Sequence, residues 1–140
     1  MTIRKTKKKV ETEDQWIKRR ASQARASWLR RAKKLEIDIK DIPTKEEIME
    51  ILKYPIICYL SNSPISKDTV ELDHKIPTSR GGLFKLSNVG ITSRYYNQVK
   101  GDLTEKEFRS LLKTVSKWED KGKSLFTRLL SSGNRFKKIK

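Results

Sequence analysis

Apolar residues recur about once per helical turn along the N-terminal part of the chain. The recurring positions are Trp16, Ala24, Trp28, Ala32 and Leu35. Most arginines and lysines between them fall elsewhere on the helical wheel, so one stripe can pack while the rest faces water or phosphate. Thr12 and Gln15 form a capping box, which predicts that a helix begins there. We interpret the two tryptophans as core residues and not as platforms for stacked bases.

A second capping box, Thr44 with Glu47, predicts a short helix that Pro55 closes. Ile48, Ile51 and Leu52 fall on one side of it. The preceding segment, 36–43, is expected to be a linker.

A third capping box, Thr104 with Glu107, opens the helix with the most regular spacing. Its apolar positions are Phe108, Leu111, Leu112, Val115 and Trp118. Apolar residues at 125–130 predict a last short helix before a basic tail.

Between these helices the pattern changes to that of β-strands. Residues 54–60 are mainly apolar and partly β-branched, 62–64 have turn chemistry, and 69–73 alternate. This pattern predicts a small hairpin with His74 at its exit.

The segment after His74 carries further signals of short elements. Residues 89–92 can form a return strand, and Ser93 can cap a helix over 94–100 that stops at Gly101. The predicted order of strand, loop, strand and helix places the fold in the α+β class.

Charge is concentrated at the two ends of the 140-residue chain, which has a formal net charge of +16. Residues 1–35 carry 13 Lys and Arg against 3 Asp and Glu, residues 121–140 carry 7 against none, and the residues between carry 13 against 14. Basic ends suit a polyanion, because each neutralised phosphate releases counterions. We therefore expect nucleic acid as the partner; the alternative is that the basic residues only keep exposed helices in solution.

Composition also excludes several classes of site and location. No apolar run approaches the ~20 residues of a membrane-spanning helix, and no secretory signal follows the basic start. The expected location is therefore intracellular and cytoplasmic. Cys58 is the only cysteine and His74 the only histidine, so neither an internal disulfide nor a four-ligand structural zinc site is expected.

The segment VELDHKIPTSRGG, followed by LSNVGIT, RYYNQVKG and GDLTEKEF, resembles the HNH endonucleases, particularly the small phage-encoded ones. The resemblance covers residues 58–108 strongly and the flanking helices loosely. Its specificity lies in the ordered combination of Asp73-His74, Ile-Pro, Gly-Gly, Asn88 and Asn97-x-x-Lys-Gly.

The resemblance implies a ββα-metal (His-Me finger) core that binds one divalent cation, usually Mg²⁺, with Mn²⁺ or another divalent cation as a substitute. His74 would be the general base and Asn88 would brace the loop that orients it. Asp73 and Asn97 would bind the metal through hard oxygen donors. The cation would stabilise charge on the transition state and on the leaving 3′ oxygen.

Double-stranded DNA is the partner that the resemblance implies. The candidate DNA-binding residues are Lys100, Arg80, Arg94, Arg30 and Arg31. Lys100 could contact phosphate or only favour the C-terminal end of a helix dipole, and Arg80 could contact DNA or solvent. Glu71 is interpreted as a strand residue and not as a ligand.

Two departures from the family pattern bear on the metals. Asn97 stands where the family's name places its last histidine, a variant that keeps an oxygen ligand. In many members of the family a zinc ion bound by two Cys-x-x-Cys pairs also stabilises this fold. The corresponding positions here are Cys58 with Ser61 and Ser93 with Tyr96. No zinc is therefore expected, and packing, including that of Tyr59 and Tyr96, has to stabilise the core.

These observations predict one folded unit with three parts: a basic arm and helices at 1–53, a nuclease core at 54–103, and C-terminal helices with a basic tail at 104–140. The predicted function is metal-dependent hydrolysis of DNA phosphodiester bonds. The alternative is a basic nucleic-acid-binding protein that keeps the fold without catalysis. Packaging, an intron or host defence, and a phage protein as partner, are all compatible with the sequence.

Overall fold

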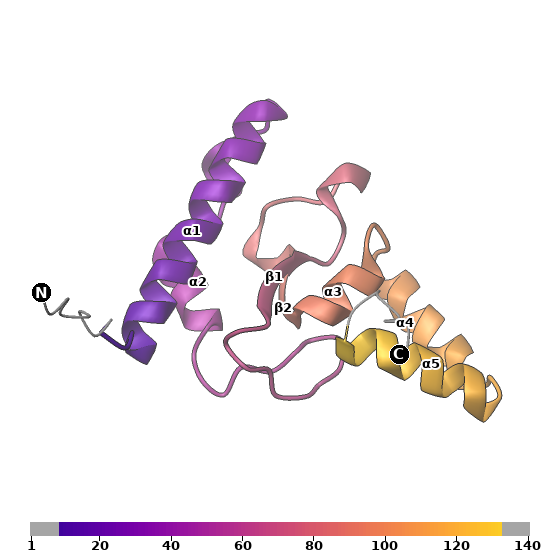
Figure 1. Cartoon of the computed structure of the whole chain (residues 1–140). Helices are drawn as coiled ribbons and strands as arrows, with labels where there is room; N and C mark the ends of the chain where they lie inside the picture. Colours follow the sequence, from indigo (N-terminus) through magenta and orange to yellow (C-terminus); the bar gives the residue numbers. More distant parts are fainter. Residues whose placement is uncertain (1–8, 133–140) are drawn as a thin grey trace, which may run out of the picture.

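The structure is a computed structural model, and it describes residues 9–132. It has an α+β fold in which a two-stranded antiparallel sheet lies between two groups of helices (Figure 1). α1 (Glu13–Lys34) and α2 (Lys45–Ile51) pack together on one side. α3 (Arg94–Lys100), α4 (Glu105–Val115) and α5 (Asp120–Ser132) lie on the other. The first eight residues of the predicted basic N-terminal arm and residues 133–140 of the basic tail lie outside the described residues.

The three predicted capping boxes are confirmed, each with both reciprocal hydrogen bonds. In α1, Trp16, Trp28 and Ala32 of the predicted stripe are buried, so both tryptophans are core residues. Leu35, by contrast, is 54% exposed beyond the last turn. The buried stripe also includes Ile17 and Ala21, which the spacing argument missed. α1 packs on α2 and also contacts β1, through Trp28 and Arg20.

The segment predicted as a linker, 36–43, contains a 3-10 turn at Ile39–Asp41. Ile42 is buried, and the Arg25 guanidinium donates to the Pro43 carbonyl at 3.2 Å. The segment therefore fixes α2 against α1 instead of separating them.

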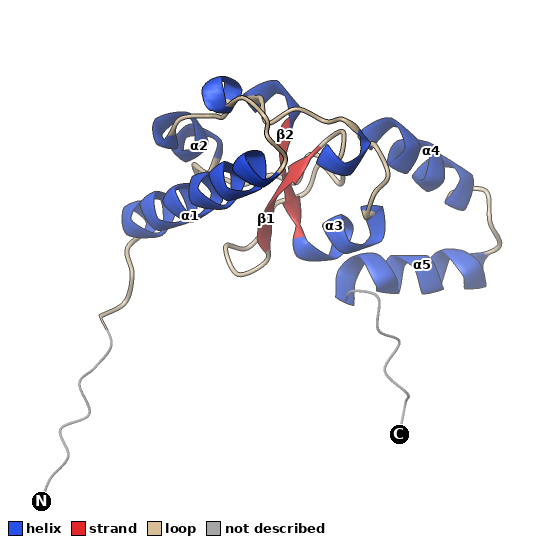
Figure 2. Cartoon of the chain, turned by 90° about the horizontal axis from the view of Figure 1, so that it is seen from above, coloured by secondary structure: helices blue, strands red, loops and turns tan. Residues whose placement is uncertain are grey.

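The sheet consists of β1 (Val70–His74) and β2 (Val89–Ser93), which run side by side in the middle of the molecule (Figure 2). In their antiparallel register, Asp73 faces Gly90 and His74 faces Val89. The predicted return strand is confirmed. The predicted pairing of 54–60 with 69–73 is wrong. Instead, 54–65 turns back on itself, with one isolated bridge between Ile57 and Pro64.

Proline and neighbouring contacts explain that difference. Pro55 and Pro64 have no N–H to donate to a ladder, which limits how far this segment can pair. Within the turn, Cys58 N donates to Ser63 O at 2.9 Å, and Tyr59 N donates to Ile91 O at 2.8 Å. The segment thus lies beside β2 and places the Tyr59 side chain over it.

The C-terminal helices differ from the prediction at their ends. α3 begins at its Ser93 cap and stops before Gly101, as predicted. α4 ends at Val115, so Trp118 lies beyond it, where its ring stacks edge-on with Phe126 at 6.1 Å. α5 begins at Asp120, earlier than the apolar residues at 125–130 indicated.

One apolar core connects the three predicted parts of the chain. It contains Trp16 and Trp28 from α1, Val70 from β1, Ile91 from β2 and Phe108 from α4. None of the helices within 9–132 is both long and apolar enough to cross a membrane. The continuous core holds the ends of β1 and α3 in a fixed relation, and these ends form the site described next.

Candidate catalytic cleft

A cleft of about 260 Å³ lies where the C-terminal end of β1 meets α3 and the C-terminal part of α1. Its walls come from three segments distant in sequence, and its lining residues are Arg31, Leu72, Asp73, His74, Pro77, Thr78, Ser79, Asn97, Gly101 and Asp102. The structure therefore brings together the sequence-predicted base His74 and both predicted metal ligands, Asp73 and Asn97. Two larger hollows on the α1 surface contain none of His74, Asp73 and Asn97, although Arg31 also lines one of them.

His74 is the last residue of β1, and the residue is 7% exposed. The ring packs edge-on against Trp28 at 5.5 Å and Phe84 at 5.0 Å between ring centroids. Its Nε2 is buried and has no hydrogen-bond partner among the described residues. Burial lowers the pKa of His74 to about 4, with a further lowering by the positive charge of Arg31. This pKa is well below the ordinary value of about 6.5 that the sequence suggested, so the imidazole is neutral at pH 7.

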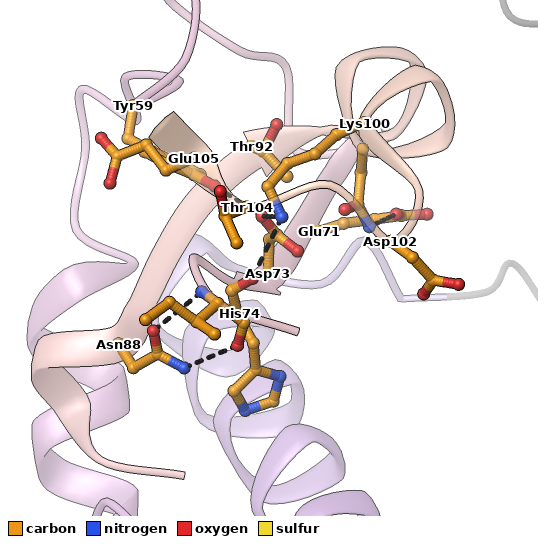
Figure 3. Close-up of polar contacts among 12 residues, drawn as sticks. Tyr59, Glu71, Asp73, His74, Asn88, Thr92, Lys100, Asp102, Thr104 and Glu105 are labelled. Atoms are coloured by element: carbon orange, nitrogen blue, oxygen red, sulfur yellow. Dashed lines mark hydrogen bonds and ion pairs between the residues drawn. The ribbon is translucent and has the colours of Figure 1, made fainter. Parts of the chain in front are cut away.

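Asp73 is almost buried, and one of its two oxygens carries all of its side-chain contacts. The Tyr59 hydroxyl donates to Asp73 Oδ2 at 2.5 Å, and the Lys100 ammonium lies 3.0 Å from the same atom (Figure 3). Burial, and then the hydrogen bond to Asp73, raise the pKa of Tyr59, so the phenol stays protonated and donates. Gly90 makes this contact possible, because a Cβ there would lie 2.5 Å from the Tyr59 ring.

Lys100 does not lie on the surface, which corrects its interpretation as a phosphate-contacting residue. The residue is 1% exposed, and besides Asp73 its ammonium donates to the His74 carbonyl at 3.1 Å. The ammonium points from the last turn of α3 toward the end of β1 (Figure 3). It thus ties these two elements together beneath the cleft.

Asn97, on the middle of α3, is oriented by an acidic neighbour. Its Nδ2 donates to Glu71 Oε2 at 2.7 Å, and Glu71 in turn lies 3.6 Å from Arg94. Glu71 is a strand residue, as predicted, but it also fixes the amide. With Nδ2 engaged, the Asn97 Oδ1 is left for another partner.

Asn88 braces the loop that follows β1. Its Oδ1 accepts from Ile76 N, and its Nδ2 donates to the Ile76 and Leu83 carbonyls, each at 2.9 Å. Its own carbonyl accepts from Lys75 N at 2.8 Å. None of these hydrogen bonds goes to the His74 side chain, so through them Asn88 orients that residue by way of the loop backbone.

The same loop requires a glycine at one position. A Cβ on Gly82 would lie 1.7 Å from the Ile76 carbonyl oxygen, whereas the neighbouring Gly81 has open space but a φ of +82°. The Gly-Gly pair therefore serves two different needs: close approach at Gly82 and a left-handed conformation at Gly81.

The predicted DNA-binding arginines occupy different environments. Arg31 lines the cleft and donates to Thr78 Oγ1 at 3.2 Å. Arg30 is exposed one residue earlier on α1. Arg80 forms an ion pair with Glu107, and Arg94 donates to the Asp68 carbonyl at 3.0 Å. Only Arg31 among the four contributes to the cleft itself.

The positions that correspond to zinc-binding cysteines in the resembled family lie near each other. Cys58 is buried, and its thiol lies 3.5 Å from the Thr92 hydroxyl and within hydrogen-bonding reach of Ser61 and the Ser93 backbone. The Tyr96 ring, on α3, stacks edge-on against Phe108. Packing and neutral hydrogen bonds connect the 54–65 turn to β2 and α3 here.

Two side-chain oxygens of the kind that hard divalent cations take line the cleft. In residues 9–132 no group of three or more His, Cys, Asp or Glu side chains could hold a metal ion. Asp73 and Asn97 nevertheless line one cleft, each with a side-chain oxygen, Oδ1, that no described residue engages. A cation such as Mg²⁺ commonly keeps several waters and takes only one or two protein ligands together with phosphate oxygens.

Sequence reasoning assigned Tyr59 only to packing and missed its hydrogen bond to Asp73, and it did not assign Glu71 the contact that orients Asn97. Tyr59 lies 14 positions before Asp73, and its only sequence signal is the glycine in VGIT that leaves room for an aromatic ring. Glu71 lies two positions before Asp73, on the same face of the strand, which is the pattern that could have indicated it.

No family model, curated protein or solved structure gave a significant match to the chain. A conclusion about function therefore depends on the cleft geometry and the sequence motif.

Proposed function

We propose that the protein is a metal-dependent endonuclease of the HNH type, with a ββα-metal core formed by β1, β2 and α3. The observation that carries the proposal is the single cleft that gathers His74, Asp73 and Asn97 beside Arg31. Chance does not explain this clustering well, because the sequence motif selected these three residues independently of the structure. The proposed substrate is DNA in the cytoplasm. By analogy with the small phage-encoded endonucleases that the motif resembles, this would be the cytoplasm of a cell that carries a phage.

Hydrolysis would proceed by attack of water on a backbone phosphorus, with formation of a new P–O bond and loss of the 3′ oxygen. His74 would accept the proton from the attacking water. Since Nε2 is enclosed by the protein, Nδ1 is the nitrogen left to face a water in the cleft. The low pKa of His74 leaves the imidazole unprotonated at neutral pH, so a ring nitrogen is free to accept the proton, although it is a weaker base than an imidazole with a pKa near 7.

Asp73 and Asn97 would hold the divalent cation through their Oδ1 atoms. When bound, that ion supplies positive charge beside the phosphate and the leaving oxygen. Arg31 would bind a non-bridging oxygen of the same phosphate, since its guanidinium lines the cleft and its present partner, the Thr78 hydroxyl, is neutral.

The exposed basic residues of α1 would extend this contact along the DNA backbone. They include Lys18, Arg19, Arg30, Lys33 and Lys34. Such contacts neutralise phosphates without reading bases, so the core is expected to bind many sequences.

One observation favours a second function, a nucleic-acid-binding protein without catalysis. Asp73 is already paired with Lys100, and a carboxylate paired in this way is a poorer metal ligand than a free one. A protein that had lost catalysis would keep the basic surface and could keep such a pair for stability.

Incubation of supercoiled plasmid with the protein and Mg²⁺ or Mn²⁺ separates these functions. The proposed nuclease converts the plasmid to nicked or linear DNA, and EDTA abolishes the conversion. A plasmid that is bound but left intact over a series of divalent cations would support the binding protein and contradict the nuclease.

A further inference from the structure

Lys100 is the most deeply buried charged side chain in the described part of the chain, and it lies beneath the cleft. Its side chain is 0% exposed, and its ammonium contacts Asp73 Oδ2 and the His74 carbonyl. Lysine is almost never fully buried unless it is paired, because removal of its charge from water is costly. The partner it takes here is the carboxylate proposed to bind metal.

The charges around the cleft cancel. Asp73 is paired with Lys100 at 3.0 Å, and Glu71 lies 3.6 Å from Arg94. Of the two remaining ionised residues that line the cleft, Arg31 is positive and Asp102 is negative. The formal charges of these six acidic and basic side chains sum to zero, although a cation site normally depends on a surplus of carboxylates.

We propose that Lys100 is a built-in counter-charge to Asp73, which prevents a divalent cation from binding tightly until DNA phosphates enter the cleft. This inference rests on the proposed nuclease function. Two protein oxygens in a cleft without net negative charge compensate poorly for the hydration that a divalent cation loses on binding. A DNA backbone adds negative charge and phosphate oxygens, so cation and DNA bind together.

The contacts of Asp73 separate this charge effect from simple positioning. Tyr59 and Lys100 bind the same oxygen, Oδ2, but only Lys100 carries charge. Neither of them contacts Oδ1. If these contacts only positioned Asp73, loss of the Tyr59 hydroxyl and loss of the Lys100 ammonium would change metal affinity equally. If charge matters, loss of the ammonium has the larger effect.

Mn²⁺ binding, measured by electron paramagnetic resonance of the free ion, tests the proposal without reliance on activity. The wild-type protein without DNA is expected to bind Mn²⁺ with roughly millimolar or weaker affinity. Lys100→Met removes the charge and keeps the length of the side chain, and it should raise this affinity by roughly tenfold or more. Tyr59→Phe removes a hydrogen bond to the same oxygen without a change of charge, and it should alter the affinity far less.

The coupling to DNA is measured with a short duplex, in a His74→Gln background that slows cleavage during the titration. The duplex should raise Mn²⁺ affinity by roughly tenfold or more, and Mn²⁺ should raise DNA affinity by the same factor, because linkage is reciprocal. The two factors are obtained independently and have to agree.

Lys100→Met leaves Asp73 buried without its cation, so thermal unfolding of each variant is followed with and without Mn²⁺. Mn²⁺ should raise the Tm of Lys100→Met more than that of wild type. Lys100→Gln, which can still donate to Asp73, replaces Lys100→Met in every measurement if the latter does not fold.

Each result bears on the proposal in a definite way. Tight Mn²⁺ binding by wild type without DNA, or equal affinities in wild type and the Lys100 variant, would overturn it. If such a protein still cuts plasmid in Mg²⁺, the nuclease function stands and only the counter-charge is wrong. Absence of Mn²⁺ binding with and without DNA, together with an intact plasmid, would overturn both.

Discussion

Acidification from pH 7.5 to pH 5 is expected to destabilise the protein through one residue, His74. It is the only histidine of the chain, so no other side chain with an ordinary pKa near 6.5 titrates in this interval. Burial lowers its pKa to about 4 in the folded protein, whereas the unfolded chain keeps the ordinary value. The unfolded state therefore binds a proton first as the pH falls, and the folded state loses stability.

The size of the effect follows from the two pKa values. At pH 7.5 the imidazole is neutral in both states and contributes no pH dependence. At pH 5 the unfolded chain is largely protonated and the folded protein is not, a difference of about 2 kcal/mol in the free energy of unfolding. The loss continues toward pH 4 and then levels off, because below the folded pKa both states carry the proton.

Urea unfolding of wild type and His74→Phe at constant ionic strength measures this contribution. Phenylalanine keeps an aromatic ring between Trp28 and Phe84 but cannot titrate. The carboxylates are common to both proteins; Glu107, whose hydrogen bond from Arg80 lowers its pKa to about 2, is one of them. The stability difference between the proteins should change by about 2 kcal/mol from pH 7.5 to pH 5. Parallel pH profiles would refute the account of His74 as a buried neutral base.

Further variants test other parts of the cleft. Asn88→Ala removes three hydrogen bonds to the loop after β1 and should lower the free energy of unfolding by about 2–3 kcal/mol in urea; an unchanged midpoint would contradict the bracing role. Gly82→Ala places a Cβ against the Ile76 carbonyl and should prevent stable folding, as followed by circular dichroism, whereas Gly81→Ala, with open space, should cost only about 1 kcal/mol for its left-handed backbone. Arg31→Ala should slow cleavage of bound DNA by about tenfold or more, whereas the exposed neighbour Arg30→Ala should reduce only affinity and its salt dependence; equal rates of cleavage by the two variants would remove Arg31 from the cleft chemistry.

Local sequence signals predicted the starts of α1, α2 and α4 correctly, because a capping box depends on residues three apart. The capping residue Ser93 and the terminal Gly101 fixed α3 in the same way. Trp118 was assigned to α4 in error, since helical spacing continues past the point where the chain leaves the helix. Periodicity specifies which residues could share a face but not where the backbone turns.

Strand pairing and side-chain burial could not be predicted to the same degree. The apolar segment 54–60 and β2 both had strand-like composition, and only the three-dimensional packing selected β2 as the partner of β1. Lys100 at the end of a helix before Gly101 looks like an exposed residue that favours the helix dipole. Its burial depends on the approach of α3 to the end of β1, which no local pattern encodes.

The cleft, in contrast, could be anticipated in part because its residues belong to an ordered motif. Asp73, His74 and Asn97 were specified as a group, and the structure brings them together. The motif gave no sign that Asp73 would be engaged by Tyr59 and Lys100. These contacts involve residues 14 positions before and 27 positions after Asp73, and they depend on the fold as a whole.

Single-turnover cleavage of prebound duplex DNA by wild type and His74→Gln in Mg²⁺, with DNA affinity measured in parallel, tests the central claim most directly. The proposed role of His74 as base predicts that the variant binds DNA with nearly unchanged affinity and cuts it roughly 10²–10⁴-fold more slowly. Cleavage by both proteins at the same rate at pH 8, or no cleavage by wild type on DNA that it binds, would contradict the assignment of this cleft as a nuclease site.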